Sequence, residues 1–231
     1  GILTEATAEL AFALILAAAR RVVDLDRRTR AGEWTCWAPL LFLSREVSGK
    51  TLGIVGLGRI GRAVARRAQA FGMRVLYHNR SRLDQAEERD LGVEYAEQDE
   101  LLRTSDFVSL HVPLSDETRH LLGRRELGLM KPTSYLINTS RGPVVDEAAL
   151  VEALRDRRIE GAGLDVYENE PLLTPGLTDL DNVVLMPHVG SATVETRMKM
   201  ARMAAENLLA GLRGERPAHV VNPEVWSRRK A

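Results

Sequence analysis

The sequence has a single cysteine, no excess of either charge and no hydrophobic run long enough to cross a bilayer. Cys36 has no partner for an internal disulfide, so the fold does not require an oxidising compartment, and a cytoplasmic location is expected. The 32 basic and 32 acidic residues cancel, which gives no reason to expect a nucleic-acid or membrane partner. The 231 residues, 45% of them hydrophobic, suffice for a sizeable core.

The most apolar run, Leu10–Ala19, is about half the length of a membrane-spanning helix, and no basic stretch precedes it as in a signal peptide. We therefore expect a buried helix, capped by Thr4 and with Glu5 near its positive end. Apolar residues lie on nearly every face of this helix, so it should make contacts on more than one side.

From Gly49 onward, short β-rich runs alternate with helical patterns, and there is no internal repeat, low-complexity segment or long linker. Strands are predicted at Thr51–Gly56, Met73–Tyr77, Phe107–Val112, Tyr135–Thr139, Gly163–Val166 and Val183–Met186. Helices are predicted at Ile60–Ala70, Asp84–Leu91, Asp99–Arg103, Thr118–Met130, Asp146–Arg157 and Ala192–Leu212. This alternation predicts an α/β fold, a doubly wound parallel sheet covered by helices on both faces.

The run G-I-V-G-L-G-R-I-G places Gly56, Gly58 and Gly61 at the positions of a dinucleotide-binding fingerprint. A strand pattern precedes the glycines and an amphipathic helix pattern follows them, which is the context that this motif requires. The pattern favours a Rossmann site, in which helix N-terminal amides bind a pyrophosphate. Methyltransferases with a related glycine loop, and a purely structural turn, are the alternatives.

The stretch V-L-Y-H-N-R-S-R contains no acidic residue. An NAD-binding fold would have one at this point, at the end of its second strand. An acid there would accept a hydrogen bond from the ribose 2′-hydroxyl and repel a 2′-phosphate. Arg80 would instead pair with that phosphate, with Asn79 and Ser81 donating beside it. The alternative is a solvated arginine pair and an indifferent cofactor choice, since Asp84 is nearby.

Three polar residues, Arg141, Glu170 and His188, each follow a predicted strand at the edge where open α/β sheets bind ligands. A guanidinium suits a carboxylate, and an imidazole held by a carboxylate can act as an acid or a base. Taken singly, they could be a capping arginine, a solvated glutamate and a histidine bonded to backbone. Together, beside a nucleotide fingerprint, they indicate an active site.

Residues 1 to 226 resemble the D-isomer-specific 2-hydroxyacid dehydrogenases, most closely the glyoxylate/hydroxypyruvate reductase branch. The ordered motifs that carry the resemblance are T-E-A-T-A-E-L-A-F-A-L-I-L, G-K-T-L-G-I-V-G-L-G-R-I-G, S-D-F-V-S-L-H-V-P-L, L-I-N-T-S-R-G-P-V-V-D-E-A-A-L, G-A-G-L-D-V-Y-E-N-E-P and N-V-V-L-M-P-H-V-G-S-A-T. The resemblance implies that Arg141 holds the carboxylate and keto oxygen of a 2-oxo acid. It also implies that His188 donates the proton during reduction and that Glu170 orients His188.

The cofactor residues follow from the fingerprint, the strand end and the resemblance together, and they include no metal ligand. They are Gly56, Leu57, Gly58, Arg59, Ile60, Gly61, Asn79, Arg80, Ser81, Thr139, Ser140, Arg141, Asp165, His188, Val189 and Gly190. In this set Asp165 is implied to lie near the nicotinamide carboxamide. NADP(H) is the preferred cofactor, and NAD(H) remains possible.

The resemblance also implies that a part of the substrate domain, which precedes Gly1 in full-length members, is missing. We expect residues 1–187 to form the dinucleotide-binding domain, with an interdomain helix at 4–24 and a homodimer arm at 25–48. Exposed Trp34, Trp37 and Leu40 would suit a dimer contact, although a satellite core cluster is the alternative. Residues 188–231 would form a long C-terminal helix and tail that pack toward the substrate domain.

Two functions remain open at this point. The first is an NADP-preferring oxidoreductase that reduces glyoxylate or hydroxypyruvate to the D-2-hydroxy acid, in which a proton from His188 meets the charge developing on the carbonyl oxygen. The second is a truncated dinucleotide-binding and dimerising module with little or no catalysis. Family members that act on phosphoglycerate, lactate, formate or phosphite are not firmly excluded.

Overall fold

The computed structural model describes residues 1–228. Its strands form one seven-stranded parallel sheet in the order β3-β2-β1-β4-β5-β6-β7. The strands are β1 (Thr51–Val55), β2 (Arg74–His78), β3 (Glu94–Tyr95), β4 (Phe107–Leu110), β5 (Tyr135–Asn138), β6 (Gly161–Leu164) and β7 (Val183–Leu185). The helices are α1 (Thr4–Ala19), α2 (Val22–Arg30), α3 (Arg59–Ala70), α4 (Gln85–Leu91), α5 (Gln98–Thr104), α6 (Arg124–Leu127), α7 (Glu147–Arg155) and α8 (Val194–Leu212), with short 3-10 turns η1 (Gly142–Val144) and η2 (Pro223–Arg228). The predicted fold class is confirmed, and among the strands only the short β3 was missed.

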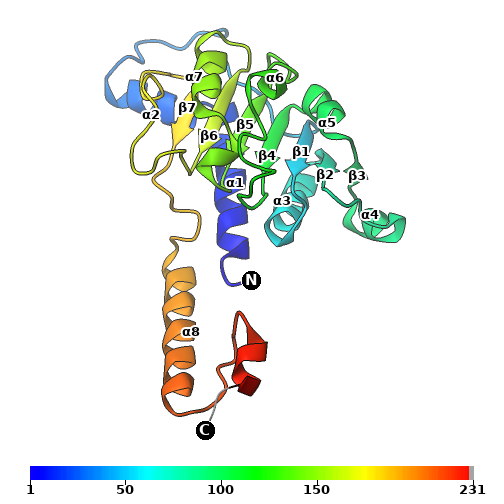
Figure 1. The fold of residues 1–231 in the computed structure, drawn as a ribbon. Helices are drawn as coiled ribbons and strands as arrows, with labels where there is room; N and C mark the ends of the chain where they lie inside the picture. Colours follow the sequence, from blue (N-terminus) through cyan, green and yellow to red (C-terminus); the bar gives the residue numbers. More distant parts are fainter. Residues whose placement is uncertain (229–231) are drawn as a thin grey trace.

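Helices cover both faces of the sheet (Figure 1). The side chains of a strand alternate between the two faces, so Ile54 packs in a cluster with α1 and α3, whereas Val55 packs with α5 and α7. Strand β1 lies between β2 and β4, and the chain crosses to the other side of β1 after β3. This reversal creates the switch point at which open α/β sheets bind ligands.

The predicted helix at the start of the chain is two helices. Leu3, not Thr4, occupies the N-cap of α1, and it makes no side-chain cap. Helix α1 contacts α3 and strands β5, β6 and β7, as its apolar faces predict. The predicted segment 4–24 breaks at Arg21, whose φ is 53°, and Asp24 of α2 holds Arg21 at 2.6 Å. No helix within residues 1–228 has the length and apolarity to span a bilayer.

The helix predicted at Thr118–Met130 is wrong for most of its length, because only α6, at Arg124–Leu127, is helical. The hydroxyl of Thr118 bonds to the Pro113 carbonyl at 2.6 Å, and His120 has a left-handed φ of 51°. Such local side-chain bonds offer the backbone an alternative to a helix. The helix begins only after Gly123, whose N–H is accepted by Glu126 at 3.0 Å.

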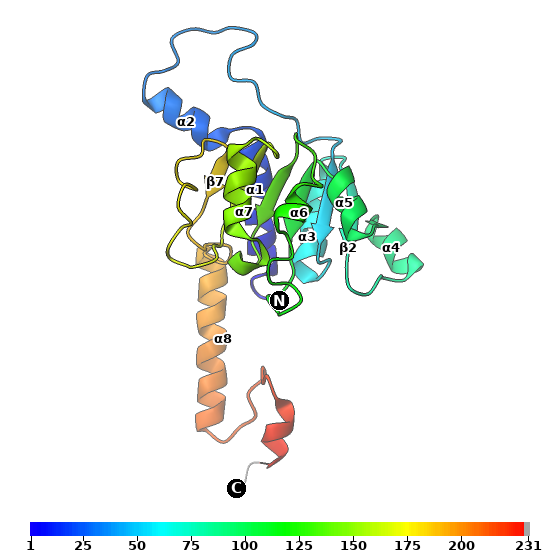
Figure 2. The same cartoon turned by 45° about the horizontal axis from the view of Figure 1, so that its top comes forward.

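Two segments leave the body of the sheet (Figure 2). Residues 31–48 loop away on one side and expose Trp37 and Leu40, which are 80% and 82% accessible. Helix α8 extends on the other side and ends at Leu212 as predicted, and Gly214, with a φ of 79°, follows its end. Only Thr196 of α8 is buried. The last residues of the predicted segment 188–231 lie outside the described residues.

Candidate functional site

The glycine loop lies between β1 and α3 and leaves an open face. Gly56 has a φ of 98°, and a Cβ there would lie 2.8 Å from the carbonyl carbon of His111. A Cβ on Gly61 would lie 2.4 Å from the carbonyl oxygen of Gly56, so glycine lets α3 approach the loop. A Cβ on Gly58 would meet nothing within 4 Å. The amides at the start of α3 therefore have free space beside them, which suits an anion.

The carboxyl ends of β1, β2 and β4 surround a cleft of about 610 Å³. It brings together six of the predicted cofactor residues, which are Gly56, Leu57, Gly58, Asn79, Arg80 and Ser81. It also includes residues that sequence reasoning missed, among them Gln98, His111, Ser115, Glu117 and Thr118. Arg59 and Ile60 instead line a neighbouring hollow, next to Met200 and Met203 of α8.

The polar side chains after β2 differ in whether they already have a partner within the protein. The Asn79 side-chain oxygen accepts the Leu57 N–H at 2.7 Å, which ties β2 to the glycine loop. Arg82 forms two bonds with the buried Glu88, at 2.8 and 2.9 Å, and this guanidinium lowers the Glu88 pKa to about 2. Arg80 has no ion-pair partner among residues 1–228 and lines the cleft. Of the two arginines, only Arg80 is available to a ligand.

Asp84, which sequence reasoning left as a partner for the arginines, has another role. Its carboxylate caps α4 by accepting the Glu87 N–H at 2.8 Å. Such a cap stabilises a helix by about 1 kcal/mol. No ion pair joins Asp84 to a described arginine, so it leaves Arg80 free.

A partly buried histidine, His111, forms part of the cleft at the end of β4. Its Nε2 lies 2.8 Å from the Ser109 hydroxyl. Burial lowers the pKa of His111 to about 4, so the ring is neutral near neutral pH. It can therefore offer a hydrogen bond without a charge. The motif L-H-V-P was visible in the sequence, but His111 was assigned only to a strand.

The strand end after β5 carries Thr139, Ser140 and Arg141 on a backbone that Asn138 fixes. The Asn138 side chain donates to the Arg141 carbonyl at 3.0 Å and accepts the Ser140 N–H at 3.0 Å. The Thr139 hydroxyl oxygen is buried without a partner in residues 1–228. Buried polar atoms are normally bonded, so Thr139 is poised for a ligand.

Asp165, after β6, holds the loop that contains His188. Its two carboxylate oxygens accept the N–H groups of Val189 and Gly190, each at 2.7 Å. Burial raises the pKa of Asp165, and the two backbone bonds oppose that rise only in part. Both oxygens are thus used within the protein. Contact between Asp165 and a nicotinamide carboxamide stays a prediction.

Arg141, Glu170 and His188 line one pocket of about 570 Å³. Glu170 Oε2 lies 2.7 Å from Nδ1 of His188, and Glu170 Oε1 accepts the Tyr167 N–H at 3.0 Å. Burial raises the Glu170 pKa, but the bonds from His188 and Tyr167 and the nearby charges outweigh it, so the pKa is lowered. The carboxylate fixes the imidazole and leaves Nε2 for other contacts. Each catalytic residue predicted from the sequence thus lies at this pocket.

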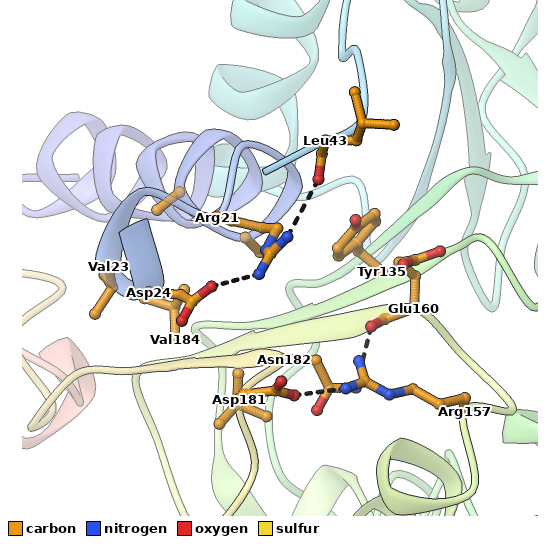
Figure 3. Close-up of a pocket in the computed structure, with 13 residues that line it drawn as sticks. Arg21, Val23, Asp24, Leu43, Tyr135, Arg157, Glu160, Asp181, Asn182 and Val184 are labelled. Atoms are coloured by element: carbon orange, nitrogen blue, oxygen red, sulfur yellow. Dashed lines mark hydrogen bonds and ion pairs between the residues drawn. The ribbon is translucent and has the colours of Figure 1, made fainter. Parts of the chain in front are cut away.

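A separate hollow lies at the opposite, amino edge of the strands (Figure 3). Four of its charged side chains form two ion pairs: Arg21 contacts Asp24 at 2.6 Å and Arg157 contacts Asp181 at 2.6 Å. None of the predicted site residues lines it. The candidate site is therefore the carboxyl edge alone.

Comparison with known proteins matches this geometry to one family. Residues 12–190 match the sequence profile described as D-isomer specific 2-hydroxyacid dehydrogenase, NAD binding domain. A glyoxylate reductase of Thermococcus litoralis is 55% identical over 229 residues, covering 97% of this chain and 69% of that protein. One of Aeropyrum pernix is 57% identical over 231 residues, covering 97% and 68%.

A solved structure is also similar. It is an NADPH-dependent glyoxylate/hydroxypyruvate reductase from Sinorhizobium meliloti in complex with NADP and malonate. It has a TM-score of 0.85 and 37% identity, and the match covers 96% of this chain and 69% of that one. The chain thus spans somewhat more than two thirds of the relatives that it matches.

Glu170→Gln should remove a pH-dependent part of the stability. Because the Glu170 pKa is lowered in the folded protein, the charged form stabilises the fold above the ordinary value of 4.5, and this contribution is lost as pH falls through the folded value. The difference in unfolding free energy between wild type and variant, measured in urea, should shrink from about pH 7 to about pH 3. Glu195→Gln, at the exposed start of α8, is the control. A constant difference would contradict the prediction.

Proposed function

Because the chain belongs to the D-isomer-specific 2-hydroxyacid dehydrogenase family, we propose that it reduces glyoxylate or hydroxypyruvate to the D-2-hydroxy acid, with NADPH preferred over NADH. The observation that carries this proposal is the Glu170–His188 pair, which shares a pocket with Arg141. The glycine loop and this pocket belong to the same edge of the sheet. The relatives named as glyoxylate reductases support the choice of substrate.

The residues present fit a dinucleotide. The Thr139 hydroxyl is buried without a partner in the described chain, and the Gly58 position is open. We propose that Gly56–Gly61, Asn79–Ser81, Thr139–Arg141, Asp165 and His188–Gly190 hold the cofactor, directly or by positioning the backbone that does. When bound, a reduced nicotinamide supplies the hydride for the C2 carbonyl carbon.

The chain's own side chains then have distinct tasks. Arg141 donates from its guanidinium to the substrate carboxylate and keto oxygen, since its planar fork matches two oxygens. His188 donates a proton from Nε2 as negative charge develops on that oxygen. Glu170 accepts from Nδ1 and fixes the orientation of the ring. Glu170 is thus a positioning residue that acts through His188.

The cofactor preference rests on Arg80. Arg82 is committed to Glu88 and Asp84 to the α4 cap, so the acid that would repel a 2′-phosphate is absent from this strand end. Arg80 and Ser81 line the cleft, and the Asn79 amide nitrogen is left to donate beside them. Because no acid at the end of β2 pairs with it, the Arg80 guanidinium is suited to bind a phosphate.

We also propose that residues 188–231 pack toward a substrate domain, as the family resemblance implies. Helix α8 exposes Val194, Met198, Leu208 and Leu212, at 77%, 66%, 63% and 75%. Because the chain spans about 69% of its relatives, a dinucleotide-binding module with little catalysis is the second candidate. Turnover of NADPH with glyoxylate by this chain would refute the module. Binding of NADPH without turnover would support it.

The arm at residues 25–48 is proposed to join two copies of the chain. It begins within α2 and continues as the loop seen in Figure 2. Trp34, Trp37, Leu40 and Leu43 expose 60%, 80%, 82% and 62% of their surface. Apolar side chains gathered on one segment are typical of an interface.

His188→Asn should lower turnover with glyoxylate by about 100-fold or more, because a positioned general acid contributes that much. The dissociation constant for NADPH, measured by fluorescence titration, should change little, since the glycine loop and Arg80 are intact. Ser191→Ala, on the same loop, is the control for local disturbance. Turnover equal to wild type would remove His188 from the proposed chemistry.

Arg80→Ala should lower kcat/KM with NADPH by about 10-fold or more, with little change for NADH, because a charge-assisted phosphate contact is lost. Steady-state oxidation of both cofactors, at fixed ionic strength, measures the ratio. Arg82→Ala should alter stability through Glu88 but leave the ratio near wild type. An unchanged ratio in Arg80→Ala would contradict the phosphate pocket.

Leu40→Asp should convert a dimer into monomers, because an aspartate in an apolar interface loses its hydration. Analytical ultracentrifugation of wild type and variant gives the mass in solution. Val221→Asp, at an exposed apolar residue outside the arm, is the control. A monomeric wild type, or a dimeric Leu40→Asp, would exclude the arm as the contact.

A further inference from the structure

The segment after β4, residues 113–118, forms a wall of the cofactor cleft. Ser115, Glu117 and Thr118 line the same cavity as Arg80 and Ser81. These residues come from different strand ends, on the two sides of the glycine loop. A carboxylate on this segment therefore shares the cavity with the guanidinium that follows β2.

Local hydrogen bonds fix the shape of this wall. The Ser115 N–H donates to the Thr118 hydroxyl at 2.8 Å, and that hydroxyl donates to the Pro113 carbonyl at 2.6 Å. The Ser115 hydroxyl donates to Glu117 Oε2 at 2.6 Å. Such side-chain bonds define a turn without a helix or strand. Glu117 is thus held in place although it is exposed to solvent.

The charges on the two sides of the cleft are opposite. The Ser115 hydrogen bond holds the pKa of Glu117 below its usual value, and the positive charge of Arg80 adds to that effect. Glu117 is therefore a carboxylate at neutral pH. No acid among residues 1–228 forms an ion pair with Arg80, and Glu117 is the acidic residue in the lining of this cavity. The positive charge of Arg80 thus acts on a carboxylate that lines the same cleft.

We propose that Glu117 is a specificity-determining residue of the cleft, whose carboxylate opposes a 2′-phosphate by repulsion and by competition for Arg80. The inference rests on the proposed function, in which the adenosine half of the cofactor lies beside Arg80. Glu117, from the segment after β4, would thus do what an acidic residue after β2 does in an NAD-binding fold. The preference for NADPH over NADH is then a balance between Arg80 and Glu117, and NADH remains usable.

The test compares two probes that differ only in the 2′-phosphate, 2′,5′-ADP and 5′-AMP, on the full chain by calorimetry. Glu117→Gln should raise the ratio of the 5′-AMP to the 2′,5′-ADP dissociation constant by about 2- to 5-fold, the size of an exposed charge interaction. The increase should decline at high salt, because both charges are exposed to solvent. An unchanged or smaller ratio would overturn the proposal.

Two further variants make the test specific. Asp116→Asn removes the neighbouring acid, which does not line the cleft, and should leave the ratio at the wild-type value. Glu117→Asp keeps the charge and should also stay near wild type. A rise in either variant as large as that of Glu117→Gln would overturn the proposal, by showing a general charge effect or a change of loop shape.

Failure of the proposed function has a different signature. A wild-type ratio at or below one, unchanged by Arg80→Ala, would refute the phosphate pocket, whereas the role of Glu117 is judged by the change that its own variant causes. If the wild-type chain bound neither 2′,5′-ADP nor 5′-AMP, both the phosphate pocket and the role of Glu117 would be overturned. Unfolding midpoints in urea, equal for all variants, establish that the comparison concerns folded protein.

Discussion

The parallel arrangement of the strands is the constraint on which the site depends. Because all strands point the same way, the residues that follow β1, β2, β4, β5 and β6 reach one edge of the sheet. The close approach of α3 to the glycine loop, which Gly61 permits, sets the cleft beside β1. Residues far apart in the chain, such as Arg80 and Glu117, are neighbours of one cavity for this reason.

Within that edge, several polar groups support other groups instead of facing a ligand. Asp165 uses both carboxylate oxygens on the Val189 and Gly190 amides, and Glu170 divides its oxygens between Tyr167 and His188. These bonds fix the loop that contains His188. In the role of proton donor that we propose for it, a side chain held in this way would lose little conformational freedom when a substrate binds, which is what preorganisation of a site requires.

The segments where sequence patterns were wrong are those in which local side-chain bonds override periodicity. The pattern from Thr118 to Met130 has helical spacing, but the Thr118 and Ser115 turns and the left-handed His120 keep its first part irregular. The helix predicted at 4–24 extends past the apolar run of α1, yet the chain turns at Arg21. The spacing of hydrophobic residues indicates which face of an element is buried, but it does not indicate where such side-chain bonds form.

The sequence by itself determined the alternation of strands and helices, the glycine loop, and the places of Arg141, Glu170 and His188 at strand ends, because these depend on local spacing. Only the tertiary structure decided which arginine after β2 is free, since the Tyr77 hydroxyl of β2 and the Arg82 guanidinium both donate to Glu88 of α4. It also decided that Glu117 lines the cleft of Arg80. Contacts between distant segments follow from how elements pack, and no short stretch of sequence encodes them.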